Sequence, residues 1–155
     1  MFTIGLVERV LDKAPVARLA QIDDGGCAQV LPFVFVRVDR TLWSPVDAKP
    51  KKHARLSRLA WIAARPEVCV LVDYYGEDWS RLWWLKIYAR AEVIRNAHPQ
   101  RERAIAGLAQ KYDQYPATPM FYGEPTMIRM QWHAWKAWSA SGTAAVEAWL
   151  ATSDR

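Results

Sequence analysis

The sequence has little cysteine and no long hydrophobic run, and each absence excludes a class of protein. Cys27 and Cys69 are the only cysteines among 155 residues, which is too few for a disulfide framework and lacks metal-ligand spacing. No apolar run approaches the roughly 20 residues that span a bilayer. Residues 1–14 contain charges and no small-residue cleavage site, unlike a signal peptide. We therefore expect a cytoplasmic protein without a membrane segment.

The sequence also lacks the common catalytic and nucleotide-binding motifs. It contains no GxGxxG, P-loop, GxSxG, HExxH or CxxC pattern. His53, His98 and His133 are scattered, without partners at metal-ligand spacing. We therefore predict no metal site, and the catalytic side chains remain unknown at this point.

The composition that is present indicates a globular domain with an anionic partner. Apolar residues make up 52% of the chain, and the length predicts a single domain over residues 1–155. The formal net charge of +5 favours an anionic partner. Nine tryptophans are many for this length. We expect most of them in the core or in a dimer interface, because many exposed large rings would promote aggregation.

The hydrophobic periodicity predicts about six strands with helices between them. Helical spacing covers residues 3–13, 99–112 and 143–150, and another helix follows Pro50 and ends near Arg65. Alternating or β-rich runs cover residues 16–22, 28–38, 41–44, 68–74, 81–94 and 127–135. Turn residues at 23–26 and 39–40 join the first three strands into an antiparallel meander. The pattern is typical of an antiparallel barrel with peripheral helices and not of a Rossmann fold.

Two residue patterns refine this prediction. Pro32 lies inside the second strand, so this strand is expected at a sheet edge or at a bulge. In the helix over 99–112, Ile105, Leu108 and Ala109 are expected on the buried face.

A basic segment and an aromatic segment carry the functional signal. Residues 47–58 read DAKPKKHARLSR, and residues 71–85 read LVDYYGEDWSRLWWL. Lys51 and Lys52 lie near the predicted start of a helix, where free N–H groups favour anions, and Arg55 and Arg58 share one face of that helix. Rings beside cations suit a ligand with a flat ring at one end and phosphate at the other. The alternative for the basic segment is a solvated surface.

In its predicted elements and motifs the chain resembles the pyridoxamine 5'-phosphate oxidase-like split-barrel family, and more narrowly its small flavin- or deazaflavin-dependent branch. The residues that carry the resemblance are VARLAQID at 16–23, LPFVFV at 31–36, the run from LWSPVDAKPKKHARLSR to AARP at 42–66, VCVLVDYYGEDWSRLWWLKIYARAEVI at 68–94 and WKAWSA at 135–140. The resemblance implies a mainly β fold with peripheral helices, a six-stranded antiparallel split β-barrel. It also implies a homodimer with two cofactor sites at the subunit interface.

The resemblance also implies roles for particular residues. The end of the third strand and the following helix would hold the cofactor phosphate, and the strand that bears Trp83 and Trp84 would contribute to the ring side of the pocket. The phosphate side then comprises Trp43, Ser44, Lys49, Lys51, Lys52, Arg55 and Arg58, and the ring side comprises Trp83 and Trp84, with Trp135 and Trp138 reaching the pocket of the other subunit. The chain departs from the family at Trp61 and Arg65, where members often have asparagine.

Several functions are compatible with these residues. The first hypothesis is an FMN-binding oxidoreductase that transfers hydride to or from a small unidentified substrate, because a flavin ring itself carries the hydride. Coenzyme F-420, a deazaflavin with a phosphate and polyglutamate tail, is the alternative cofactor. A cofactor-binding protein without turnover is a second class. A nucleic-acid-binding module ranks low, since the tryptophans follow strand spacing and no nucleic-acid motif is present.

Overall fold

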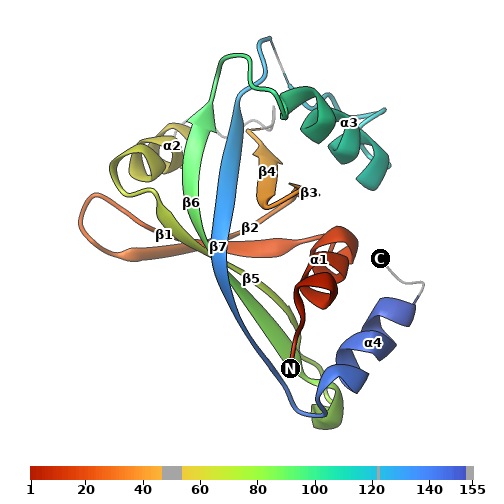
Figure 1. Ribbon diagram of the computed structural model, residues 1–155. Coiled ribbons are helices and arrows are strands. Elements are labelled where there is room, and N and C mark those ends of the chain that lie inside the picture. Colours follow the sequence, from red (N-terminus) through yellow and green to blue (C-terminus); the bar gives the residue numbers. More distant parts are fainter. Residues whose placement is uncertain (47–53, 122, 153–155) are drawn as a thin grey trace.

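The computed structural model describes residues 1–46, 54–121 and 123–152, with side chains at all of these except 54–56. Helices lie before, between and after the strands along the chain, as the periodicity predicts (Figure 1). In chain order they are α1 (Ile4–Lys13), β1 (Ala17–Ile22), β2 (Ala28–Phe33), β3 (Val36–Val38), β4 (Thr41–Pro45), α2 (Ala54–Ala64), β5 (Glu67–Tyr74), η1 (Trp79–Arg81), β6 (Trp83–Ile94), α3 (Arg101–Lys111), β7 (Met127–Ser139) and α4 (Thr143–Ala151).

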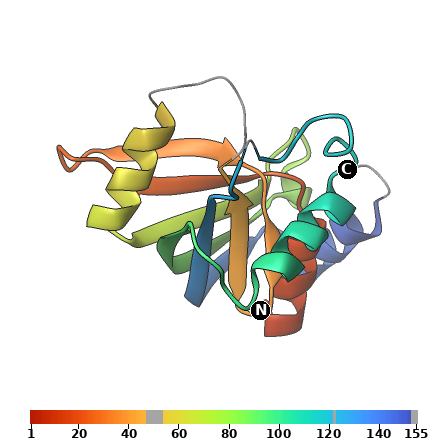
Figure 2. The same cartoon turned by 90° about the horizontal axis from the view of Figure 1, so that it is seen from above.

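The described strands form one antiparallel sheet of seven strands in the order β2-β1-β5-β6-β7-β4-β3. The sheet curls strongly, and the helices lie around its periphery (Figures 1 and 2). The mainly β class, the antiparallel pairing and the peripheral helices are therefore as predicted. β2 is an edge strand, which agrees with the expectation drawn from Pro32.

The expected strand over residues 28–38 is two strands, so the sheet has seven strands where the sequence predicted six. The break lies at Val34 and Phe35, between β2 and β3. The backbone N–H of Phe35 donates to the Tyr112 hydroxyl at 3.1 Å, and this hydroxyl lies 3.1 Å from the Phe35 carbonyl. These backbone groups therefore have a partner outside the sheet ladder.

The predicted opening meander is wrong in one respect. β1 pairs with β2 and β3 pairs with β4, but β2 and β3 lie at opposite edges of the sheet. Phe35 is fully buried at the crossing point and packs against Phe33 with ring centroids 5.5 Å apart. Burial of the Phe35 ring in the core favours a chain that crosses from the β2 edge of the sheet to the β3 edge. The predicted meander would instead have continued as a third strand beside β2.

Two clusters of buried side chains fill the space between the sheet and the helices. The larger includes the apolar face of α1, where Val7, Val10 and Leu11 are fully buried. Thr3 caps this helix, because its hydroxyl accepts a hydrogen bond from the Leu6 N–H. The smaller cluster joins α3 to β3 and β4 and contains Trp43.

The buried face of α3 is rotated from the predicted one. Ala104 and Leu108 are fully buried, whereas Ala109 is exposed and Ile105 is half-buried. Positions 104 and 108 are four residues apart and share one face, while residue 109 lies about 100° further around the helix. Leu108 was therefore assigned correctly and Ala109 wrongly.

The close approach of α3 to β3 depends on a glycine. A Cβ at Gly107 would lie 2.9 Å from Cγ2 of Val36. We expect Gly107→Ala to lower the free energy of unfolding by about 1–3 kcal/mol, because the helix must move away from the strand. Urea denaturation measures this effect. Gly5→Ala in α1 is the control, because its Cβ would meet nothing within 4 Å. A stabilisation of up to about 1 kcal/mol is expected there, and equal effects of the two variants would contradict the packing argument.

Candidate functional site

Side chains along β6 alternate between the core and the outside of the sheet. Trp83, Leu85 and Ile87 are fully buried, whereas Trp84 and Lys86 are only half-buried. This is the period of two that a strand with one buried face requires. The two adjacent tryptophans therefore have different environments, since only Trp84 faces outward.

The register between β6 and β7 groups two tryptophans and two lysines on the outer face. Trp84 lies opposite Trp138, and Lys86 lies opposite Lys136. Residues directly opposite each other in an antiparallel pair project from the same face. We call these four residues the Trp–Lys face. Trp138 is 42% exposed, and the Lys86 Nζ lies 4.8 Å from the centroid of the Trp84 ring.

Lys86 and Lys136 bring like charges together on the outer face of β6 and β7. Among the described residues, neither Lys86 nor Lys136 forms a salt bridge. Asp73 lies opposite Trp84 on β5, but its carboxylate is bonded to Arg18 at 2.9 Å. Like charges directly opposite on adjacent strands destabilise a sheet. An anionic ligand bound at this face would remove that repulsion.

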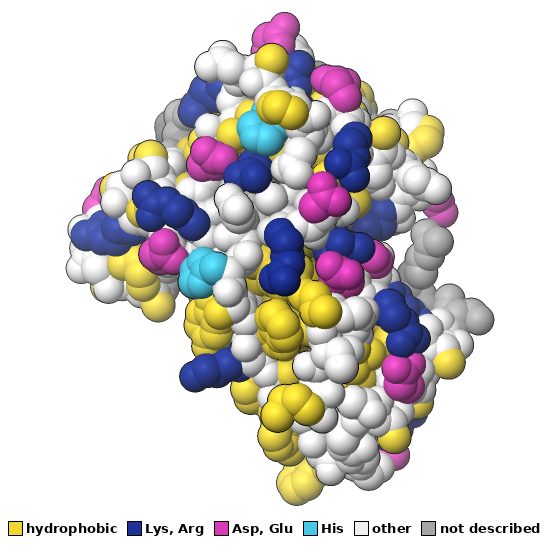
Figure 3. Space-filling model, in the orientation of Figure 1, with side chains coloured by type: hydrophobic (Ala, Val, Ile, Leu, Met, Phe, Trp, Pro, Cys, Tyr) yellow, Lys and Arg dark blue, Asp and Glu magenta, His cyan; other side chains and the backbone are white. Residues whose placement is uncertain are grey.

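Half-buried apolar side chains extend the Trp–Lys face onto β5. Leu71 lies opposite Lys86, and Cys69 lies opposite Tyr88. Burial raises the pKa of the Cys69 thiol, an effect that the charge of Lys86 partly offsets. Figure 3 shows hydrophobic side chains gathered over the lower half of the molecule, where β5, β6 and β7 run. The face thus combines flat apolar surface with concentrated positive charge.

Other residues predicted for the site lie in the protein interior. Trp43 and Trp83 are fully buried and Ser44 is 2% exposed. The Trp43 Nε1 donates to the Thr41 hydroxyl at 3.1 Å, and the Trp83 ring packs edge-on against Trp149 at 4.9 Å between centroids. In this structure these three side chains pack the core and are not accessible to a ligand.

The basic segment is only partly described. Lys49, Lys51 and Lys52 lie outside the described residues, as does the side chain of Arg55. Arg58 is half-buried on α2. The assignment of these residues to a phosphate group therefore stays a prediction.

Trp135 and Trp138 lie on opposite sides of β7. Trp135 is opposite the buried Ile87 and packs edge-on against Trp132, with centroids 6.0 Å apart. Trp138 is opposite Trp84 on the outer face. Of the predicted aromatic residues, the structure therefore brings together only Trp84 and Trp138.

Comparison with known proteins identifies the fold. No family model and no curated protein matches the chain. Solved structures do match: an FAD-binding protein from Mesorhizobium loti has a TM-score of 0.61 and 21% identity, covering 88% of this chain and 94% of its own. The heme storage protein HutZ from Vibrio cholerae has a TM-score of 0.66 and 14% identity, covering 90% and 95%. An F-420 reductase has a TM-score of 0.58 and 19% identity, covering 83% and 94%.

The chain has the pyridoxamine 5'-phosphate oxidase-like split-barrel fold. This confirms the fold predicted from the sequence. The three matched structures are described as binding or using different cofactors. Fold alone therefore does not assign a cofactor, because function depends on the side chains of the site.

Sequence reasoning missed Lys86 and Lys136. Lys86 could have been found, because in an alternating strand it shares the face of Trp84 two residues earlier. Lys136 could not, because its position opposite Lys86 depends on the register between two strands that are separated by α3 and a long loop.

In the described ranges, His, Cys, Asp and Glu side chains do not cluster in a group of three that could hold a metal ion. Nor do those ranges contain a helix with the length and apolar character needed to cross a membrane.

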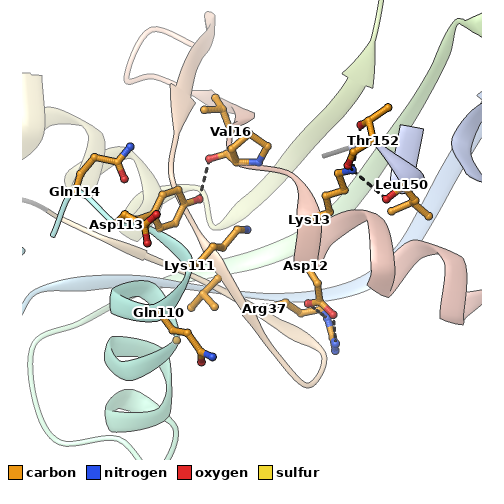
Figure 4. Close-up of a pocket in the computed structure, with 14 residues that line it drawn as sticks. Asp12, Lys13, Val16, Arg37, Gln110, Lys111, Asp113, Gln114, Leu150 and Thr152 are labelled. Carbon is orange, nitrogen blue, oxygen red and sulfur yellow. Dashed lines mark hydrogen bonds and ion pairs between the residues drawn. The ribbon is translucent and has the colours of Figure 1, made fainter. Parts of the chain in front are cut away.

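A groove of about 1070 Å³ lies away from the Trp–Lys face, between the C-terminal ends of α1, α3 and α4 (Figure 4). Lys111 points into it, and its Nζ donates to the carbonyls of Leu11 at 3.2 Å and Phe35 at 3.0 Å. Burial lowers the pKa of Lys111 to about 8. The neighbouring Tyr112 hydroxyl donates to the Pro15 carbonyl, and burial raises the pKa of Tyr112 to about 12.

The lowered pKa of Lys111 predicts a pH dependence of stability. Below pH 8 this amine is charged in both the folded and unfolded states, so its burial cost is constant. Between about pH 8 and the unfolded pKa near 10.4 the folded state has lost the proton that the unfolded state keeps. The free energy of unfolding is therefore expected to rise by roughly 1 kcal/mol from pH 8 to 9 relative to Lys111→Met. Urea denaturation of both proteins at each pH measures the difference, and parallel pH profiles would contradict this pKa.

Proposed function

We propose that this split barrel is an oxidoreductase that binds a flavin-type cofactor on the Trp–Lys face. The observation that carries the proposal is the register that places Trp84 beside Trp138 and Lys86 beside Lys136. Indole rings provide flat apolar surface for a ring system, and paired ammonium groups attract phosphate. The donor set therefore fits a ligand with a flat ring and an anionic tail.

FMN is the first candidate cofactor. When bound, a flavin supplies the hydride chemistry, which explains why the sequence lacks a catalytic motif. The side chains of this chain would then bind and orient: Trp84 and Trp138 would contact the ring, and Lys86 and Lys136 would hold the anionic end. The half-buried Leu71 and Tyr88 would limit water around the ring.

Coenzyme F-420 is the second candidate, and one observation favours it. Two lysines lie together on the face, and the lysines of the basic segment add further positive charge in the sequence. A polyglutamate tail carries more negative charge than the single phosphate of FMN and would use more of these lysines.

Extraction of the purified protein followed by mass spectrometry separates these candidates. Equilibrium dialysis with FMN and with coenzyme F-420 then gives both dissociation constants. Binding of one of them in the micromolar range or tighter is expected. Failure to bind either would overturn the proposal, and salt-sensitive binding of a single-stranded oligonucleotide in its place would favour the nucleic-acid alternative.

Turnover needs a separate experiment, because the face would serve a cofactor carrier equally well. Stopped-flow reduction of the bound cofactor by NADPH, NADH or reduced F-420, followed by re-oxidation with candidate substrates, tests for an enzyme. Rapid reduction and re-oxidation would support an oxidoreductase. A cofactor that stays oxidised under all these conditions would favour the carrier.

We also propose that the protein is a homodimer. Trp138 and Trp79 are exposed aromatic residues in the isolated chain. Large exposed rings at one end of a molecule are typical of protein interfaces. Sedimentation equilibrium of the purified protein tests this, and a strictly monomeric species would contradict it.

A further inference from the structure

The groove between the C-terminal ends of α1, α3 and α4 holds the Lys111 amine at its wall (Figure 4). Lys111 is the last residue of α3, and its side chain points into the groove. Its Nζ donates to the carbonyls of Leu11 and Phe35 and lies 4.0 Å from the centroid of the Phe35 ring. These contacts fix the position of the amine. A volume of about 1070 Å³ is ample for a small organic molecule beside it.

The Lys111 amine is more reactive toward electrophiles than an ordinary lysine. Burial lowers its pKa to about 8, and the charge of Asp12 only partly opposes this effect. At pH 7 such an amine is about 10% neutral, whereas an ordinary lysine with a pKa near 10.4 is less than about 0.1% neutral. Only the neutral amine has the lone pair that attacks a carbonyl carbon. Desolvated lysines form Schiff bases with carbonyl compounds in this way.

The side chains around Lys111 favour a carbonyl compound that carries a carboxylate. Among the described residues that line the groove, three are cations and two are carboxylates, namely Lys13, Arg37, Lys111, Asp12 and Asp113. The groove therefore has an excess of one positive charge, which attracts a small anion. Gln110 and Gln114 are exposed at the groove, and their amide groups can donate hydrogen bonds to a carboxylate.

We propose that Lys111 binds a small α-oxo acid covalently, as an imine, in this groove. The amine nitrogen adds to the carbonyl carbon, and a C=N bond replaces the C=O bond. The two amine hydrogens leave with the carbonyl oxygen as one molecule of water, so the step needs no oxidant or reductant. This site is separate from the Trp–Lys face, and the inference does not depend on the proposed cofactor.

The surroundings of Lys111 also suit the product. An imine that takes up one proton from solvent is again a cation and retains one N–H group. It can therefore keep a hydrogen bond to the carbonyl of Leu11 or of Phe35, which the amine contacts at 3.2 and 3.0 Å. The carboxylate of the bound acid would neutralise the excess positive charge of the groove.

Reductive trapping with glyoxylate tests this site, because glyoxylate has an aldehyde next to a carboxylate. The full-length protein is incubated at pH 7 with glyoxylate and sodium cyanoborohydride, which reduces an imine to a stable secondary amine. Nα-acetyllysine in the same solution reports the reactivity of an ordinary lysine amine. Intact-mass spectrometry counts the adducts, and peptide mapping locates them.

Lys111 is expected to be labelled roughly 10-fold faster than Nα-acetyllysine, because its larger neutral fraction outweighs the lower nucleophilicity of a less basic amine. The rate at Lys111 should also saturate as the glyoxylate concentration rises, since a binding site fills before the reaction. A rate that stays linear in glyoxylate would overturn the inference. So would a label that maps to the exposed Lys136 and spares Lys111.

Two comparisons test the recognition of the carboxylate. Propionaldehyde, a neutral aldehyde, should label Lys111 without saturation over the same concentration range. Replacing Gln110 and Gln114 together by alanine should raise the half-saturating glyoxylate concentration about 3-fold, because two hydrogen-bond donors are lost. Gln131→Ala is the matched control, since Gln131 is exposed on β7 and does not line the groove. Equal half-saturating concentrations for the wild type and the double variant would overturn the recognition of an oxo acid in this groove.

Discussion

Replacing Lys86 and Lys136 together by glutamine is expected to weaken cofactor binding about 30-fold or more. Both ammonium groups lie on the outer face of β6 and β7, opposite each other and without a salt bridge among the described residues. Hydrogen bonds to charged groups contribute about 1.5–3 kcal/mol each when buried. Solvent at this partly exposed face reduces the contribution of each hydrogen bond. We therefore expect the two lysines together to contribute about 2 kcal/mol to the binding free energy, which is about 30-fold in the dissociation constant.

The same double variant should fold at least as well as the wild type, because it removes a repulsion between directly opposite charges. Equilibrium dialysis gives the affinity, and thermal unfolding gives the stability. Arg95→Gln is the matched control, because Arg95 is an exposed cation that comes directly after the far end of β6. An equal loss of affinity in both variants would show that only net charge matters. An unchanged affinity in the double variant would remove the lysines from the site.

Trp83→Ala is expected to lower the free energy of unfolding by about 3–5 kcal/mol. The Trp83 ring is fully buried and packs edge-on against Trp149 with centroids 4.9 Å apart. Removing it deletes a large apolar group and leaves a cavity between β6 and α4, which is the costliest class of core substitution. The lost aromatic contact contributes about 0.5–1.5 kcal/mol beyond the buried area.

Trp84→Ala, one residue later, provides the comparison. Trp84 is half-buried on the outer face, so its truncation should cost less than about 2 kcal/mol in stability while weakening cofactor binding. Urea denaturation and equilibrium dialysis of both variants separate the two roles. Similar losses of stability in the two variants would contradict the alternation that assigns Trp83 to the core and Trp84 to the site.

Some of the candidate site could be read from the sequence and some could not. The family resemblance of the sequence named Trp84 and Trp138 as site residues. It named Trp83 and Trp135 as well, and it did not show which of the four face a ligand. Burial makes that distinction, because neighbouring or odd-spaced residues on a strand face opposite sides. Trp43 and Ser44 were predicted at a strand end, but both are buried, and Trp43 packs in the cluster that α3 forms with β3 and β4.

The sequence by itself determined where the α-helices and most of the strands lie, because apolar periodicity, prolines and turn residues act over a few neighbouring positions. It did not predict the short helix η1 at Trp79–Arg81. It also contained the alternation that turns Lys86 to the side of Trp84. Only the tertiary structure decided that residues 28–38 divide between opposite edges of the sheet and that Lys136 lies opposite Lys86. The physical reason is that strand partners and register are set by burial of side chains from distant parts of the chain, and local residue preferences do not contain that information.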